Sequence, residues 1–138
     1  MKDVLIVCFG MGCGGAEKSL ISFLNRLPKD RWNVDLIVAN PNGMYMKQIP
    51  STVHFLNNQY ELENFATPMS LRRKKVCNGR DLINQASWQI KSRFLCKNLS
   101  WNEKRWELWG KHLPKLKKRY DLAISYMNGP TNYYVIDK

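Results

Sequence analysis

The spacing of hydrophobic positions changes repeatedly along this chain, and each change predicts an element. Residues 4–9 form a continuous apolar run rich in branched side chains, which predicts a strand covered on both faces. From Ala16 the apolar positions recur at helical spacing, which predicts a helix that Pro28 ends. Further strands are expected at residues 34–39, 52–56 and 122–126. Strands alternating with helices predict an α/β domain with a mostly parallel sheet and flanking helices.

Connecting segments and additional helices are expected between these strands. Ser100 and Glu103 have the spacing of a capping box, which predicts that a helix opens at Ser100. The pattern also predicts a short helical turn at 44–48, an irregular stretch at 57–79, a helix at 81–96 and the start of a helix after the turn 128–130.

The net charge of +11 is concentrated in one segment, which changes the expected partners. Residues 72–119 hold 15 Lys and Arg against 3 Asp and Glu. Such a basic segment indicates an anionic partner, either a membrane surface or a nucleic acid, although a solvated polar face stays open. On the helix predicted from Ser100, four lysines fall in one narrow stripe and are the expected membrane contacts: Lys104, Lys111, Lys115 and Lys118.

The cysteines and histidines give no metal site. The four cysteines are scattered without CxxC spacing, and the two histidines have no neighbouring ligand residues, so no metal cofactor is expected. The apolar run at 4–9 is too short and too poorly flanked for a signal peptide, and no run approaches the length of a membrane span. Scattered thiols without a secretion signal favour a cytoplasmic location.

A glycine-rich turn between the first strand and helix carries the candidate chemistry. The stretch "LIVCFGMGCGGAEKSL" places glycines at a helix N-terminus, where backbone amides approach phosphate oxygens. A P-loop is excluded because Glu17 replaces the glycine required before Lys18-Ser19. A dinucleotide site is weakly indicated. Gly10, Gly12 and Gly15 fit GxGxxG, but the second strand ends without an acidic residue, and Asp35 lies near its start.

Four segments resemble the amino-terminal domain of glycosyltransferase family 4: "GGAEKSLISFLNRL", "VDLIVANPNG", "IPSTVHFLN" and "YDLAISYMNGPTNYYVIDK". The resemblance covers residues 1–60 and 119–138, with a basic helical insertion at about 61–119. It implies that residues 1–138 form a single Rossmann-like domain of a retaining GT-B hexosyltransferase. Such an enzyme transfers a sugar from a nucleotide-sugar donor, such as a UDP- or GDP-sugar, without a metal. The acceptor would be a glycan or a lipid-linked acceptor in bacterial surface polysaccharide synthesis.

The resemblance also implies where ligands bind. The glycine turn, with Gly12, Gly14, Gly15 and Glu17, would face the donor diphosphate or the acceptor across the cleft. Glu17 would favour the helix dipole and brace the turn, although an ordinary first-turn acid remains open for it. The end of the fourth strand would face the acceptor through Tyr126, Asn128 and Thr131, with helix capping as the open alternative for the last two. The family's Glu-x7-Glu motif has no counterpart here, so no catalytic residue is assigned. The chain is expected to be an inactive, truncated part of an enzyme whose second domain completes the site, working at or near the inner face of the plasma membrane.

Two other classes of function remain as alternatives. The first is an NAD(P)-binding domain of an oxidoreductase, which the GxGxxG pattern favours. The second is a basic nucleic-acid-binding module using the tryptophans of the basic segment: Trp88, Trp101, Trp106 and Trp109. Stacking platforms usually lie on exposed sheets, whereas these tryptophans are expected in helices, so no nucleic-acid partner is expected.

Overall fold

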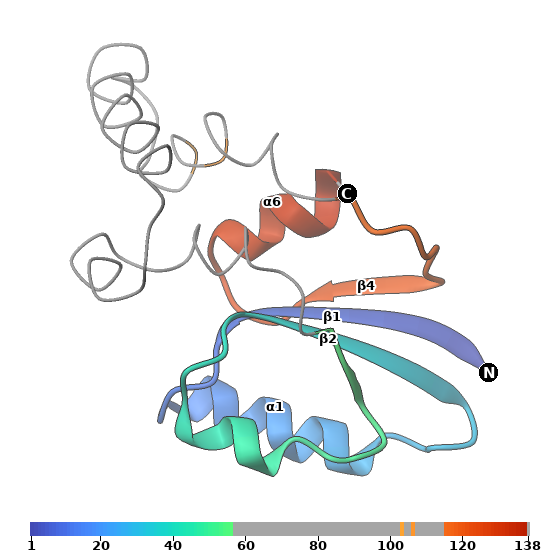
Figure 1. Ribbon diagram of the computed structural model, residues 1–138, viewed down its shortest axis with the longest axis horizontal. Helices are drawn as coiled ribbons and strands as arrows, with labels where there is room; N and C mark the ends of the chain where they lie inside the picture. Colours follow the sequence, from blue (N-terminus) through green and yellow to red (C-terminus); the bar gives the residue numbers. More distant parts are fainter. Residues whose placement is uncertain (57–102, 104–105, 107–114, 138) are drawn as a thin grey trace, which may run out of the picture.

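The computed structural model describes residues 1–56, 103, 106 and 115–137 (Figure 1). The helix predicted at 81–96 lies outside the described residues, as does most of the helix predicted from Ser100. Within that second helix, Glu103 and Trp106 are described, and both are helical.

Four parallel strands form one sheet, as the hydrophobic runs predict. They are β1 (Lys2–Gly10), β2 (Trp32–Asn40), β3 (His54–Phe55) and β4 (Leu122–Ser125), in the order β3-β2-β1-β4. Pairing of β1 with β2 places Val4 beside Val34, and pairing of β1 with β4 places Val4 beside Leu122. The predicted α/β fold with a Rossmann-like parallel sheet is confirmed.

Helices cover both faces of this sheet. In Figure 1, α1 (Gly15–Arg26) lies below the sheet and α6 (Pro130–Asp137) lies above it. The apolar face of α1 packs Leu20 and Leu24 against side chains of β1 and β2. On the other face, Trp106 and Tyr134 pack against Leu5, Val7, Ile37 and Ala39. Side chains alternate along β1 and β2, so one apolar run supplies both cores.

The element boundaries differ from the predicted ones for physical reasons. Strands β1 and β2 extend beyond their apolar runs, because the backbone pairing continues to Lys2 and Trp32 at one end and to Gly10 and Asn40 at the other. Strand β3 has two residues instead of the predicted five, because only Asp35 and Leu36 of β2 pair with it. The short helical turn is confirmed as η1 (Met44–Gln48), and α1 ends before Pro28 as predicted.

The prediction of a helical lysine stripe is wrong for its carboxyl-terminal part. Residues 115–121 are not helical, so Lys115 and Lys118 do not continue a stripe from the helix predicted at Ser100. The physical reason lies in side-chain contacts that hold this segment to the sheet: Lys118 binds Asp3 and Asp35, and the hydroxyl of Tyr120 also binds Asp35. Lys104 and Lys111 lie outside the described residues.

Candidate functional site

The strand order places a topological switch point, at which the order of the strands reverses, between the carboxyl ends of β1 and β4. From β1 the chain moves outward to β2 and β3, then returns to β4 on the opposite side of β1. Helices α1 and α6, which follow β1 and β4, therefore leave on opposite faces of the sheet (Figure 1). Open parallel sheets bind ligands at such a point. The segments that meet there are the glycine turn, residues 11–15, and the turn at residues 126–129.

The glycine turn presents open backbone to this switch point. Gly14 is the N-cap residue of α1, with φ −92° and ψ 171°, and no side chain caps the helix. Gly14 and Gly15 are exposed, and a Cβ added at Gly15 would meet no atom within 4 Å. The first-turn amides of α1 therefore keep donor capacity for a ligand oxygen, as expected at a helix N-terminus.

The side chain of Glu17 folds back over the same turn. A Cβ added at Gly14 would collide with the Glu17 carboxylate, and one added at Gly12 would lie 3.5 Å from Glu17 Oε1. The half-buried carboxylate therefore packs against the glycines from inside the first turn of α1. Burial, followed by the charge of Glu17, raises the pKa of the Cys8 thiol to about 12. A side chain at Gly14 would therefore require the Glu17 carboxylate to move, whereas one at Gly12 would only touch it.

Gly43, the last residue of the Pro-Asn-Gly stretch that follows β2, is a structural neighbour of the glycine turn. A Cβ at Gly43 would collide with the Met11 carbonyl and lie 2.8 Å from the Gly12 nitrogen. The Tyr45 amide donates to the same Met11 carbonyl at 3.2 Å. The segment after β2 therefore supports the glycine turn through backbone contact. The Pro-Asn-Gly sequence signals a turn but not this close approach.

Tyr126, from the opposite side of the switch point, contacts α1. Its hydroxyl lies 2.8 Å from Ser19 Oγ, and its ring stacks on Phe23 with the centroids 6.2 Å apart. The Tyr126 amide donates to the Val7 carbonyl at 2.9 Å. Tyr126 thus joins the β1–α1 unit to the end of β4.

Thr131 and Asn128 have different surroundings. Thr131 is only 1% exposed, and its hydroxyl donates to the Met127 carbonyl at 3.3 Å. Ser125 Oγ lies 2.9 Å from the Thr131 hydroxyl and 2.6 Å from Asn132 Oδ1. Asn128 is exposed and accepts a bond from Asn132 Nδ2 at 3.1 Å. The Thr131 hydroxyl stabilises the turn that opens α6, whereas Asn128 remains accessible.

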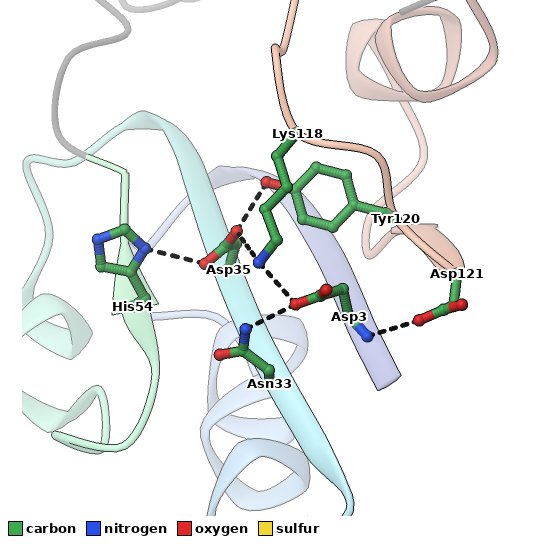
Figure 2. Close-up of polar contacts among 7 residues, drawn as sticks. All are labelled: Asp3, Asn33, Asp35, His54, Lys118, Tyr120 and Asp121. Atoms are coloured by element: carbon green, nitrogen blue, oxygen red, sulfur yellow. Dashed lines mark hydrogen bonds and ion pairs between the residues drawn. The ribbon is translucent and has the colours of Figure 1, made fainter. Parts of the chain in front are cut away.

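A second polar cluster (Figure 2) includes residues from the first halves of β1 and β2, whereas the glycine turn follows the carboxyl end of β1. Its centre is Asp35, whose side chain is 4% exposed although it stands in the apolar run of β2. Asp35 Oδ1 lies 2.9 Å from His54 Nδ1. Asp35 Oδ2 accepts from the Tyr120 hydroxyl at 2.7 Å and from Lys118 Nζ at 3.1 Å. The buried carboxylate therefore has three partners from two segments, β3 and residues 115–121.

The cluster continues to the first residues of β1. Lys118 Nζ lies 2.7 Å from Asp3 Oδ1, which also accepts from Asn33 Nδ2 at 2.6 Å. The Asp3 amide donates to Asp121 Oδ2 at 2.7 Å. These contacts hold the segment that leads into β4 against both central strands.

The contacts shift the pKa values of Asp3, Asp35 and Lys118 in the directions that favour their charged forms. Burial raises the pKa of Asp35, but the bonds from Tyr120, His54 and Lys118 outweigh burial, and the pKa lies below its ordinary value of 3.8. The bond from Lys118 lowers the pKa of Asp3, and the bond to Asp3 raises the pKa of Lys118. Burial, followed by the bond to Asp35, raises the pKa of Tyr120. Near neutral pH the cluster therefore holds ionised carboxylates and a charged lysine.

Sequence reasoning missed this cluster, although one signal was present. Asp35 is a charged residue inside the apolar run 34–39, which marks a buried group that needs partners. Its partners follow from strand register, because β2 pairs Asp35 with His54, and from the return of Lys118 to the sheet.

The tryptophan contacts bear on the nucleic-acid alternative. Trp106 is 8% exposed and stacks on Tyr133 with the ring centroids 5.9 Å apart. Its ring is therefore part of the core beside α6 and not a platform for bases. Trp88, Trp101 and Trp109 lie outside the described residues.

Two searches within the described parts of the chain give negative results. In residues 1–56, 103, 106 and 115–137, no helix is long and apolar enough to cross a membrane. In the same residues, no three His, Cys, Asp or Glu side chains gather as a metal ion would require. Comparison of the sequence and structure with protein-family models, curated proteins and solved structures found no significant match.

Proposed function

We propose that this chain is the acceptor-side domain of a retaining GT-B glycosyltransferase, resembling family 4. It would help to transfer a sugar from a nucleotide-sugar donor to a glycan or lipid-linked acceptor. A second domain would grip most of the donor, so the chain alone would carry out no transfer. The observation that carries the proposal is the position of the glycine turn at the switch point between β1 and β4.

The open backbone of the turn supports a role in binding a diphosphate. Gly14 and Gly15 are exposed, and α1 begins without a side-chain cap. Backbone amides at a helix N-terminus favour a negatively charged oxygen and need no metal to do so. In the proposed reaction these amides would stabilise the charge that develops on the leaving nucleoside diphosphate.

The Glu17 carboxylate adds a hydrogen-bond acceptor to the glycine turn. Its carboxylate packs against Gly12 and Gly14 and is half-buried. A carboxylate accepts hydrogen bonds from hydroxyl groups, so Glu17 would orient a sugar hydroxyl beside the diphosphate. The exposed Asn128 and the Tyr126 ring, from the opposite side of the switch point, would complete the acceptor side.

The proposal is tested by amide NMR of the 138-residue chain titrated separately with UDP, GDP and NADH. UDP or GDP should shift the amides of Gly12, Gly14 and Gly15, with millimolar or weaker affinity because a second domain would supply most of the donor contacts. Gly15→Val should weaken binding by about tenfold or more, because a branched side chain blocks close approach to the backbone. The space at Gly15 is open, so the fold should be kept.

A matched control separates this effect from a change in the helix. Ser22→Val places the same branched side chain at an exposed position of α1 beyond the glycine turn, and it should leave nucleotide binding unchanged. Micromolar binding of NADH without binding of UDP or GDP would instead support the oxidoreductase alternative. Micromolar binding of UDP or GDP by this chain would contradict the assignment of the donor site to a second domain.

A further inference from the structure

We propose that the cavity beside Asp35 is a second binding site, for a small phosphate monoester. The cavity has a volume of about 410 Å³ and is lined by Asn33, Asp35, His54, Leu56, Leu116, Lys117, Lys118 and Tyr120. Its lining includes residues from the first half of β2, whereas the glycine turn follows the carboxyl end of β1. The inference is therefore independent of the proposed sugar transfer.

The positive groups of the cavity retain unused donor capacity. Lys118 Nζ has three N–H groups, of which Asp3 and Asp35 use two. His54 contacts Asp35 through Nδ1, and its side chain is 69% exposed. When the imidazole carries both protons, Nδ1–H donates to Asp35 and Nε2–H can donate to an anion. Lys117 is exposed and has no ion-pair partner among the described residues.

The negative group of the cavity is already satisfied. Asp35 accepts bonds from His54, Lys118 and Tyr120, and its side chain is almost completely buried. A ligand in the cavity therefore contacts the hydrogen-bond donors that cover Asp35 and does not reach the carboxylate oxygens, which are already occupied. Asp35 would hold His54 and Lys118 in place, as a buried carboxylate does when it orients an imidazole. Asp3 and Asp35 use two of the three Lys118 N–H groups, so the third N–H, Lys117 Nζ and the His54 imidazole are the groups left to bind an anion.

The apolar walls favour an organic ester over free phosphate. Leu56 and Leu116 line the same cavity as the two lysines. Small-molecule sites combine apolar walls with a few polar groups that fix the ligand's orientation. The phosphate would contact Lys117, Lys118 and His54, while the organic part would pack on the leucines.

The burial of charged groups in the Asp35 cluster costs free energy of folding, and this cost supports a role in binding. A buried ion pair is often no more stabilising than apolar side chains of similar volume. Asp35 stands between Val34 and Leu36 in β2, where an apolar side chain would fit the pattern of the strand. Charged partners that shift a pKa beside a cavity are a feature of functional sites.

The test is an NMR titration of the 138-residue chain in phosphate-free buffer, with the imidazole of His54 and the methyl groups of Leu56 and Leu116 observed. The probes are phenyl phosphate, inorganic phosphate and phenol. Phenyl phosphate should give saturable shifts at all three side chains. Inorganic phosphate should bind more weakly, and phenol should not bind.

Two substitutions and one control decide whether the cavity is the site. Lys117→Met should weaken phenyl phosphate binding by about tenfold, the expected loss for one charge-assisted contact, and His54→Gln should also weaken it. Lys29→Met removes the same charge from an exposed residue that does not line the cavity, and it should leave the affinity unchanged. Thermal unfolding checks that each variant is folded. Equal weakening by Lys29→Met, equal binding of phenol or inorganic phosphate, or shifts that do not saturate would overturn the inference.

Discussion

Tyr120→Phe is the substitution that best isolates the energetics of the Asp35 cluster. It removes only the hydroxyl that donates to Asp35 Oδ2 at 2.7 Å and leaves the ring in place. A hydrogen bond to a charged group contributes about 1.5–3 kcal/mol. Because the ring is only partly buried, we expect a loss of about 1.5–2 kcal/mol in the free energy of unfolding near neutral pH. Urea unfolding followed by tryptophan fluorescence in phosphate-free buffer measures this loss.

Two other tyrosines calibrate this expectation. Tyr45→Phe removes a hydroxyl without a hydrogen bond among the described residues and should change the free energy of unfolding by less than about 0.5 kcal/mol. Tyr126→Phe removes a bond between two neutral hydroxyls, to Ser19, and should cost about 0.5–1 kcal/mol. The reasoning is refuted if Tyr120→Phe costs no more than Tyr45→Phe.

The cost of Tyr120→Phe should also depend on pH, with a definite sign. The pKa of Asp35 in the folded protein lies below its ordinary value of 3.8. A lowered carboxyl pKa contributes stability that is complete above the ordinary value and is lost as the pH falls through the folded-state value. The difference between wild type and Tyr120→Phe should therefore be constant from neutral pH down to about pH 5 and shrink below about pH 4. A difference that grows on acidification would contradict the assignment of an ionised Asp35.

Further predictions concern the turns and the basic segment. Gly43→Ala should lower the free energy of unfolding by about 1–3 kcal/mol, since its Cβ meets the backbone of Met11. Gly15→Ala should leave it unchanged or raise it by up to about 1 kcal/mol, and both are measured by urea unfolding. Thr131→Val should cost about 1–3 kcal/mol in the same assay, because a buried hydrogen-bonded hydroxyl is lost. The basic segment 72–119 should make the chain co-sediment with anionic vesicles more than with neutral ones at about 0.1 M salt, and equal sedimentation would contradict membrane contact.

The two central strands could be predicted because each contains a largely apolar run. A buried parallel strand must be apolar on both faces, so residues 4–9 and 34–39 identify their positions without knowledge of their partners. The helix from Gly15 to Arg26 follows from apolar spacing and from Pro28, which are also local signals. Boundaries were less predictable, because β3 is limited by its pairing with β2 and not by its own composition.

The Asp35 cluster could not be predicted because its contacts depend on the register between β2 and β3 and on the position at which the segment before β4 comes back to the sheet. His54 meets Asp35 only because β3 pairs with β2 in one register, and a shift of one residue would turn the imidazole to the other face. Lys118 reaches Asp35 across 83 positions of sequence. Local periodicity places the same lysine in a helical surface stripe, because periodicity carries no information about an acidic partner elsewhere in the fold.

The position of Asp35 also bears on the choice between the two nucleotide hypotheses. A dinucleotide site needs an acidic residue at the carboxyl end of the second strand, where it binds the ribose. Asp35 lies five positions before Asn40, the last residue of β2, which at the rise of a parallel strand places it about 16 Å from that end. Its oxygens are also occupied by His54, Lys118 and Tyr120. At the end itself, the Asn40 side-chain oxygen accepts bonds from the backbone and side chain of Asn42. The strand thus supplies no carboxylate for a ribose, and this is an argument against a dinucleotide site at the end of β2.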